Sequence, residues 1–240
     1  MKLLIDVNQI SQEEAEQGER FKDAHGVWFL KNNSQVRDDT WKAFIKKVGV
    51  PVITEDGAFD RAELASTGRV GEARRQLLDL GLDCKFCMVY VERPDIRFYD
   101  ADLNIYKPEA GKPIIVLCRN YAGENKAAIK QNLKNKNCGG VVFELKATGA
   151  WVNQIDLRRG IRDVITAGKR CFVLLTPQHP SINYRKDIAG AIRQIKRSPH
   201  WGSDKLYIVL CAYELENTGI TFLGGPNSVE GAYQYIRDMK

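Results

Sequence analysis

The chain has 240 residues, of which 44% are hydrophobic and 28% are charged, and its net charge is +6. This composition is ordinary for a globular protein and excludes a collagen-like or low-complexity chain. No apolar stretch approaches the roughly 20 residues of a membrane-spanning helix, and no basic face interleaved with aromatic residues indicates nucleic-acid binding. We therefore expect no membrane or nucleic-acid partner, and a cytoplasmic location unless a leader has been removed.

Eight short apolar runs recur along the chain, and polar or charged residues stand at or just after their ends. In chain order they are Leu3–Val7, Val27–Leu30, Pro51–Thr54, Phe86–Glu92, Ile114–Cys118, Val141–Leu145, Cys171–Leu175 and Leu206–Ala212. Continuous runs of Val, Ile and Leu are typical of strands buried on both faces, as in a parallel sheet covered by helices.

Helical patterns separate these runs. Ser11 followed by Glu14 predicts a capping box at the start of a first helix, and residues 37–48 carry apolar residues at helical spacing. Eight strands alternating with helices over roughly 250 residues predict a single-domain (β/α)8 TIM-like barrel that covers residues 1–240. Long βα loops are expected around residues 93–110 and 214–227. The alternative is an open doubly wound sheet, which would favour a phosphate-binding glycine motif that this sequence lacks.

Carboxylates at the ends of the runs indicate where the chemistry takes place, because barrel enzymes place their active sites where the strands end. Strand alternation puts Glu144 on one face with Val142, and Glu214 on one face with Ala212. If both faces point inward, the two carboxylates meet at one mouth and can divide acid and base duties. We predict Glu214 as the general acid and Glu144 as the nucleophile or base. Predicted substrate-binding residues are Asp6, Asn32, Glu55, Glu92, Arg119, Gln178 and Tyr213.

Paired carboxylates, with aromatic residues such as Trp28 and Tyr121 near strand ends, favour a glycoside hydrolase that acts on an oligo- or polysaccharide. Trp28 lies within an apolar run, however, and the favoured interpretation of this residue is a core position. No cofactor is expected, although Mg²⁺ or Ca²⁺ held by Asp6, Glu55 and Glu144 is an alternative because these ions prefer oxygen ligands. A second hypothesis is a metal-assisted phosphodiesterase or a lyase. It would hold an anion through residues that include Arg119, Lys146 and the Gly224-Gly225 turn. A third is a non-catalytic barrel that binds sugar or a protein. The oligomeric state is not predicted.

The six cysteines are predicted to be reduced and structural. Four of them fall inside apolar runs, where a free cysteine behaves as a small buried hydrophobic residue. Cys84 and Cys87 have the spacing of half a metal site, but no second CxxC pair and no pair of histidines accompanies them.

Overall fold

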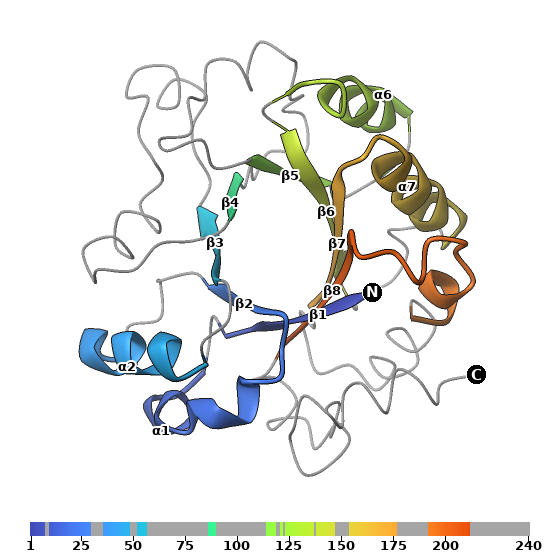
Figure 1. Ribbon diagram of the computed structural model, residues 1–240. Coiled ribbons are helices and arrows are strands. Elements are labelled where there is room, and N and C mark those ends of the chain that lie inside the picture. Colours follow the sequence, from blue (N-terminus) through green and yellow to red (C-terminus); the bar gives the residue numbers. More distant parts are fainter. Residues whose placement is uncertain are drawn as a thin grey trace, which may run out of the picture.

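Eight parallel strands pair in chain order and close on themselves as a barrel (Figure 1). They are β1 (Lys2–Asp6), β2 (Gly26–Phe29), β3 (Val52–Asp56), β4 (Phe86–Val89), β5 (Ile114–Cys118), β6 (Cys138–Lys146), β7 (Arg170–Thr176) and β8 (Leu206–Cys211). The closing contact joins β1 to β8 in register, from Lys2 opposite Tyr207 to Asp6 opposite Cys211. The prediction of an α/β fold of the TIM-barrel type is therefore confirmed.

This computed structural model describes residues 1–7, 10–29, 36–48, 52–56, 86–89, 114–118, 121, 123–136, 138–146, 154–176 and 192–211. The loops predicted around residues 93–110 and 214–227 lie outside these ranges. Within them, no helix is long and apolar enough to cross a membrane.

The described helices lie outside the barrel (Figure 1). They are α1 (Gln12–Glu16), the 3-10 helix η1 (Gly18–Phe21), α2 (Asp38–Val48), α6 (Gly123–Asn132) and α7 (Gln154–Thr166), together with the helical residues 192–196 before β8. The predicted capping box is confirmed, because the Ser11 hydroxyl accepts from the Glu14 backbone N–H at 3.2 Å and the Glu14 carboxylate accepts from the Ser11 backbone N–H at 2.5 Å. Gly168 follows α7 with a φ of 77°, a conformation that favours glycine.

The strands bury apolar residues on both faces, and this explains their unbroken apolar runs. One cluster fills the barrel interior: Leu4, Trp28, Ile115, Val142, Phe172, Leu174, Tyr207 and Val209. Inside it the Phe172 and Tyr207 rings stack with centroids 4.7 Å apart, and Trp28 meets Phe172 edge-on at 5.9 Å. The alternate strand residues, such as Leu3 and Ile5, pack outward against the helices.

Strand β6 begins three residues earlier than the predicted run, at Cys138. The sequence prediction started this strand too late because Gly139 and Gly140 carry no apolar side chain. A Cβ atom at Gly140 would collide with the backbone carbonyl of Arg170 on β7, so the close approach of the two strands requires glycine here. Cys118, Cys138 and Cys171 are buried free thiols, as predicted.

Candidate functional site

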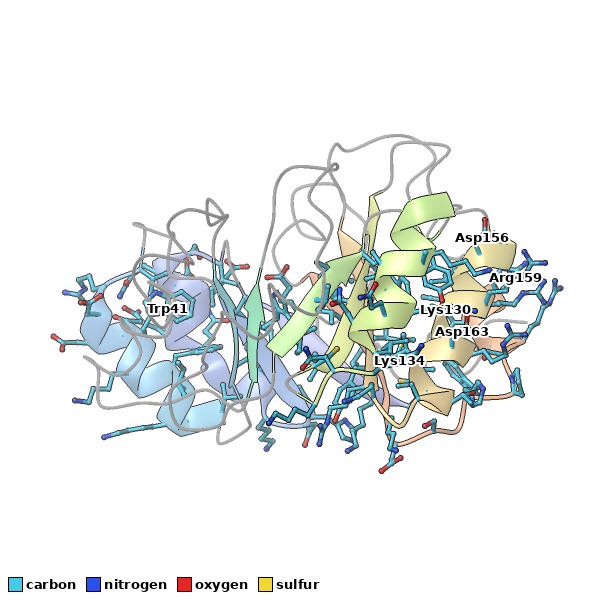
Figure 2. The ribbon with its side chains drawn as sticks, turned by 90° about the horizontal axis from the view of Figure 1, so that it is seen from above. Trp41, Lys130, Lys134, Asp156, Arg159 and Asp163 are labelled. Atoms are coloured by element: carbon cyan, nitrogen blue, oxygen red, sulfur yellow. The ribbon has the colours of Figure 1, made fainter. Side chains whose placement is uncertain are left out.

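The C-terminal ends of the eight parallel strands open on one end of the barrel. β1 ends at Asp6, β3 ends at Glu55 and Asp56, and β6 carries Glu144 near its C-terminal end. Figure 2 gives the orientation, since Asp156 at the start of α7 lies toward this end and Lys134 lies toward the other. The structure thus brings three predicted backbone positions, 6, 55 and 144, to one rim.

The other predicted site residues lie outside the described part of the chain, and so do the side chains of Glu55 and Glu144. Those others are Asn32, Glu92, Arg119, Gln178, Tyr213 and Glu214. Their catalytic and binding roles stay predictions.

Asp6 is the best-defined functional candidate at this rim. Its residue is only 2% exposed, and among the described Asp, Glu, His, Lys and Arg residues it is the only buried one. It alternates with Leu4 along β1, so it lies on the interior face, one step above the apolar cluster. It also has an interaction partner. A buried carboxylate is costly unless it is compensated, so its presence at the rim points to a role there.

The barrel below Asp6 is filled. Trp28, Phe172 and Leu174 form part of the interior cluster, and their exposed fractions are 0%, 0% and 5%. Trp28 is the register partner of Asp6 across β1 and β2, and its carbonyl accepts a 3.0 Å hydrogen bond from the Val7 backbone N–H. The ring of Trp28 is enclosed, so the interpretation of Trp28 as a core residue is confirmed and the ring does not stack on a sugar. The interior cluster forms an apolar floor on one side of the candidate site.

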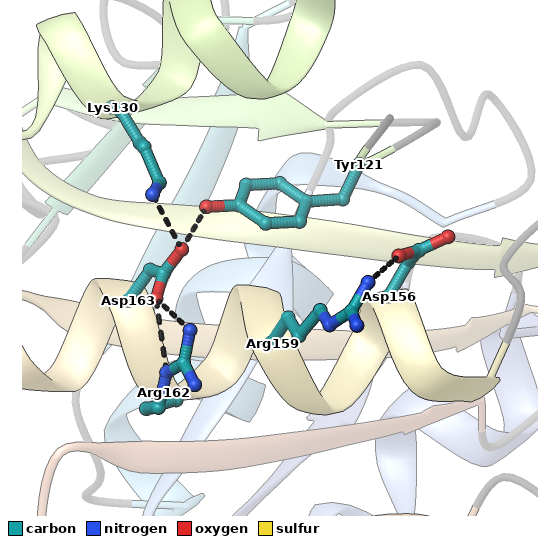
Figure 3. Close-up of polar contacts among 6 residues, drawn as sticks. All are labelled: Tyr121, Lys130, Asp156, Arg159, Arg162 and Asp163. Atoms are coloured by element: carbon teal, nitrogen blue, oxygen red, sulfur yellow. Dashed lines mark hydrogen bonds and ion pairs between the residues drawn. The ribbon is translucent and has the colours of Figure 1, made fainter. Parts of the chain in front are cut away.

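Tyr121 is also a structural residue, although its position after β5 suggested contact with substrate. Its hydroxyl donates to Asp163 Oδ2 on α7 at 2.8 Å (Figure 3). Its ring packs edge-on against Phe143 with centroids 5.6 Å apart. Arg162 donates to Asp163 Oδ1 through Nε and Nη2 at 3.1 and 3.0 Å, and Lys130 Nζ lies 3.4 Å from Oδ2. These contacts join the segment after β5, α6 and α7 in the outer layer.

Electrostatics at this cluster favour the ionised carboxylate and the neutral phenol. Burial raises the pKa of Tyr121, and the hydrogen bond to Asp163 raises it further. Burial alone would raise the pKa of Asp163. The hydrogen bonds from Tyr121 and Arg162 and the charge of Lys130 outweigh that effect and hold the pKa below its ordinary value. The sequence offered no signal for this cluster, since Tyr121 and Lys130 are far from Asp163 in the chain and meet it only through packing.

Among the described residues, no group of three or more His, Cys, Asp or Glu side chains is arranged to hold a metal ion. The alternative of Mg²⁺ or Ca²⁺ at Asp6, Glu55 and Glu144 depends on side chains outside the described part.

Comparison with known proteins identifies the fold. No model of a known protein family matches the chain, and no curated protein matches it in sequence. The chain is similar to orotidine 5'-monophosphate decarboxylase from Methanocaldococcus jannaschii complexed with the inhibitor BMP, with a TM-score of 0.58 and 12% identity, over 100% of this chain and 98% of that one. It is also similar to an enolase protein from the Sargasso Sea environmental genome sequencing, with a TM-score of 0.56 and 8% identity, over 89% of this chain and 55% of that one. At such identities the likeness concerns the fold alone.

These comparisons contradict the glycoside hydrolase prediction. The two similar barrels named above are a decarboxylase and an enolase protein, and neither is a glycosidase. The prediction was wrong because carboxylates at strand ends are not specific to sugars, and barrels use them for proton transfer and metal binding in many reactions. Glu144 and Glu214 are therefore no longer assigned as a glycosidase pair. The expectation of a carbohydrate substrate is withdrawn as well.

Proposed function

We propose that the chain is an enzyme of the lyase type that acts on a small phosphorylated molecule at the C-terminal mouth of the barrel. Asp6 is its central acid–base residue. The observation that carries the proposal is the burial of this carboxylate, 2% exposed, at the C-terminal end of β1. Active sites of this fold lie at that end.

The surroundings of Asp6 suit proton transfer. Leu4, Trp28 and Leu174 belong to the apolar cluster directly below it, so one side of the site excludes water. Electrostatic interactions are stronger where water is excluded, and a carboxylate there can take a proton from a substrate carbon or return it. Such a step accompanies the breaking of a bond next to that carbon, as lyases do.

Two considerations support a phosphorylated substrate. Barrels of this type often hold a phosphate group with the loops after their last two strands and the N-terminus of an extra helix. One of the matching structures is the decarboxylase of a nucleotide monophosphate. In this chain the predicted Gly224-Gly225 turn follows β8 and is the candidate for that role.

The proposal is tested first by binding. Purified protein is melted in the presence of nucleoside monophosphates, sugar phosphates and phosphorylated carboxylic acids, with the same compounds without phosphate alongside. A ligand at a hundred times its Kd stabilises by about 2.7 kcal/mol. For a chain of this size that raises the Tm by roughly 5–10 °C.

The second step is to compare Asp6→Asn with Asp204→Asn. Asp6→Asn preserves size and removes ionisation, so turnover of the identified substrate should fall by about 10²–10⁴. Asp204 is exposed and lies immediately before β8, at the opposite end of the barrel, so Asp204→Asn should retain normal turnover. Stabilisation by unphosphorylated compounds alone, or a fully active Asp6→Asn variant, would contradict the proposal.

We also propose that the remaining segments complete a (β/α)8 barrel as one domain over residues 1–240, in a cytoplasmic protein. Support comes from the sequence, in which Leu77, Leu78 and Leu80 form an apolar helical pattern before Gly81. Hydrogen exchange tests this part, because a helix packed on the barrel between β3 and β4 should protect the amides around residues 73–80. Exchange there at the rate of an unfolded peptide would contradict it.

A further inference from the structure

Within the described part of the chain, positive charge gathers at one end of the barrel. The helices α1, α2, α6 and α7 contain eight acidic and eight basic residues, so their charges cancel, and the helical residues 192–196 add Arg193 and Lys196. The segments at the N-terminal ends of β6, β7, β8 and β1 (residues 133–136, 167–170, 203–205 and 1–2) carry six basic side chains and a single carboxylate, Asp204. We name these six the basic face: Lys2, Lys134, Lys136, Lys169, Arg170 and Lys205.

The basic face is one continuous surface, because β6, β7, β8 and β1 are consecutive strands of the barrel. Lys169 Nζ donates to the Asn135 carbonyl at 3.1 Å and so joins the segments before β7 and β6. A Cβ atom at Gly168 would lie 3.9 Å from Lys205 Nζ, which places this ammonium beside the segment before β7. Lys2 Nζ lies 5.4 Å from the centre of the Tyr207 ring on β8.

Two of these cations, Lys134 and Lys136, are exposed to solvent. None of the six is buried, and within the described residues no carboxylate forms an ion pair with Lys134 or Lys136. The nearby positive charge also affects the pKa of His25. Burial lowers its pKa, and the positive charge of Lys2 lowers it further. Clustered cations of this kind create a positive potential that attracts polyanions.

We propose that the basic face binds the phosphate backbone of single-stranded nucleic acid. Five of the six cations are lysines, and the segments carry few apolar residues: Leu133 is buried, Met1 is partly buried and Ala167, whose side chain is a single methyl group, is exposed. Protein–protein interfaces are depleted in lysine and have an apolar centre, and peripheral membrane binding requires apolar side chains that enter the lipid. Phosphate neutralisation by lysine and arginine is sufficient for nucleic-acid binding without sequence preference.

This proposal departs from the expectation that the sequence gives no sign of a nucleic-acid partner. No basic stripe is visible along the chain, since the six residues come from four segments between residues 2 and 205. Barrel closure brings the first and last of these segments together, because β1 pairs with β8. The surface lies at the opposite end from Asp6, so the proposal does not depend on the proposed enzyme activity.

The test is binding of a fluorescein-labelled 20-nucleotide oligouridylate RNA to the full chain, measured by anisotropy between 50 and 300 mM KCl. For single strands the logarithm of the affinity falls with the logarithm of salt concentration, with a slope of about −0.7 per phosphate contact. Four contacts from the basic face therefore give a slope of about −3. The double variant Lys134→Gln/Lys136→Gln should reduce it to about −1.5 and weaken binding at least tenfold in low salt.

The matched control is Lys42→Gln/Lys46→Gln, which removes the same charge from two exposed positions of α2. It should bind as the unaltered protein does, with circular dichroism and melting showing that both variants are folded. Should the double variant melt early, Lys136→Gln alone should reduce the slope by about 0.7. Equal losses in both double variants would overturn the proposal, because net charge alone would then explain binding. Absence of RNA binding in low salt would overturn it too, as would binding to phosphatidylserine vesicles without binding to the RNA.

Discussion

Replacing Tyr121 by Phe removes one hydroxyl and should lower the free energy of unfolding by about 1.5 kcal/mol. The lost interaction is the 2.8 Å hydrogen bond to Asp163, and hydrogen bonds to charged groups contribute about 1.5–3 kcal/mol. We expect a value at the lower end of this range because Asp163 keeps its contacts with Arg162 and Lys130 in the variant. For a chain of this length the Tm should fall by roughly 3–6 °C.

Urea unfolding of the single variants Tyr121→Phe and Asp163→Asn and of the double variant isolates the interaction. Residues in contact give coupling energies of about 0.5–3 kcal/mol, and we expect a value in the upper half of this range. The pH dependence has a definite sign, because the folded pKa of Asp163 is lowered. Its ionised form therefore stabilises the fold fully above the unfolded pKa of about 3.9, and that contribution is lost as the pH falls through the folded pKa.

The matched control is Tyr207→Phe, which makes the same chemical change inside the barrel. The Tyr207 hydroxyl has no hydrogen-bond partner within the described part of the chain, and the ring contact with Phe172 is preserved. The control should change stability by less than about 0.5 kcal/mol, as substitutions away from specific interactions do. If Tyr121→Phe is as mild as the control, or its effect is unchanged in the Asp163→Asn background, the hydrogen bond does not join the two elements.

Three further changes test other parts of the fold by urea unfolding. Trp28→Ala should cost about 3–5 kcal/mol, since the enclosed ring leaves a cavity in the barrel interior, and a cost below 1 kcal/mol would mean that the interior is not packed around it. Gly160→Ala should destabilise by about 1–3 kcal/mol, because the new Cβ would lie 2.5 Å from Phe143 Cζ; a stabilised variant would show that only helix propensity matters there. Ser11→Ala should cost about 1 kcal/mol by removing the acceptor of the Glu14 backbone N–H, while an unchanged midpoint would show that the cap is dispensable.

The candidate site was predictable only in outline. Asp6, Glu55 and Glu144 were each recognised from polar residues at the ends of apolar runs, and parallel strands place positions of this kind at one rim. The reaction was not predictable, because the same carboxylates serve sugar hydrolysis, decarboxylation and metal binding equally well. Asp6 gained importance from its burial, which the sequence does not express.

The sequence alone predicted parallel strands near their observed positions and favoured a barrel over an open sheet. Runs such as Cys171–Leu175 are apolar at every position, and this pattern is stable only where both faces of a parallel sheet are covered. The Ser11–Glu14 capping box was equally readable, because its two hydrogen bonds join residues three apart in the chain. Both features arise from interactions that are local or periodic.

Only the tertiary structure decided which face of each strand is interior and which distant residues meet. The sequence around Trp28 does not show whether its ring faces the core or the mouth of the barrel. An apolar run has no alternation of polar and apolar residues that would distinguish its two faces. Tyr121 and Asp163 become neighbours through packing, and Lys2 and Tyr207 become neighbours through barrel closure. Electrostatic and hydrogen-bond energies depend on distance in space, so the polar cluster and the basic face exist only once the chain has folded.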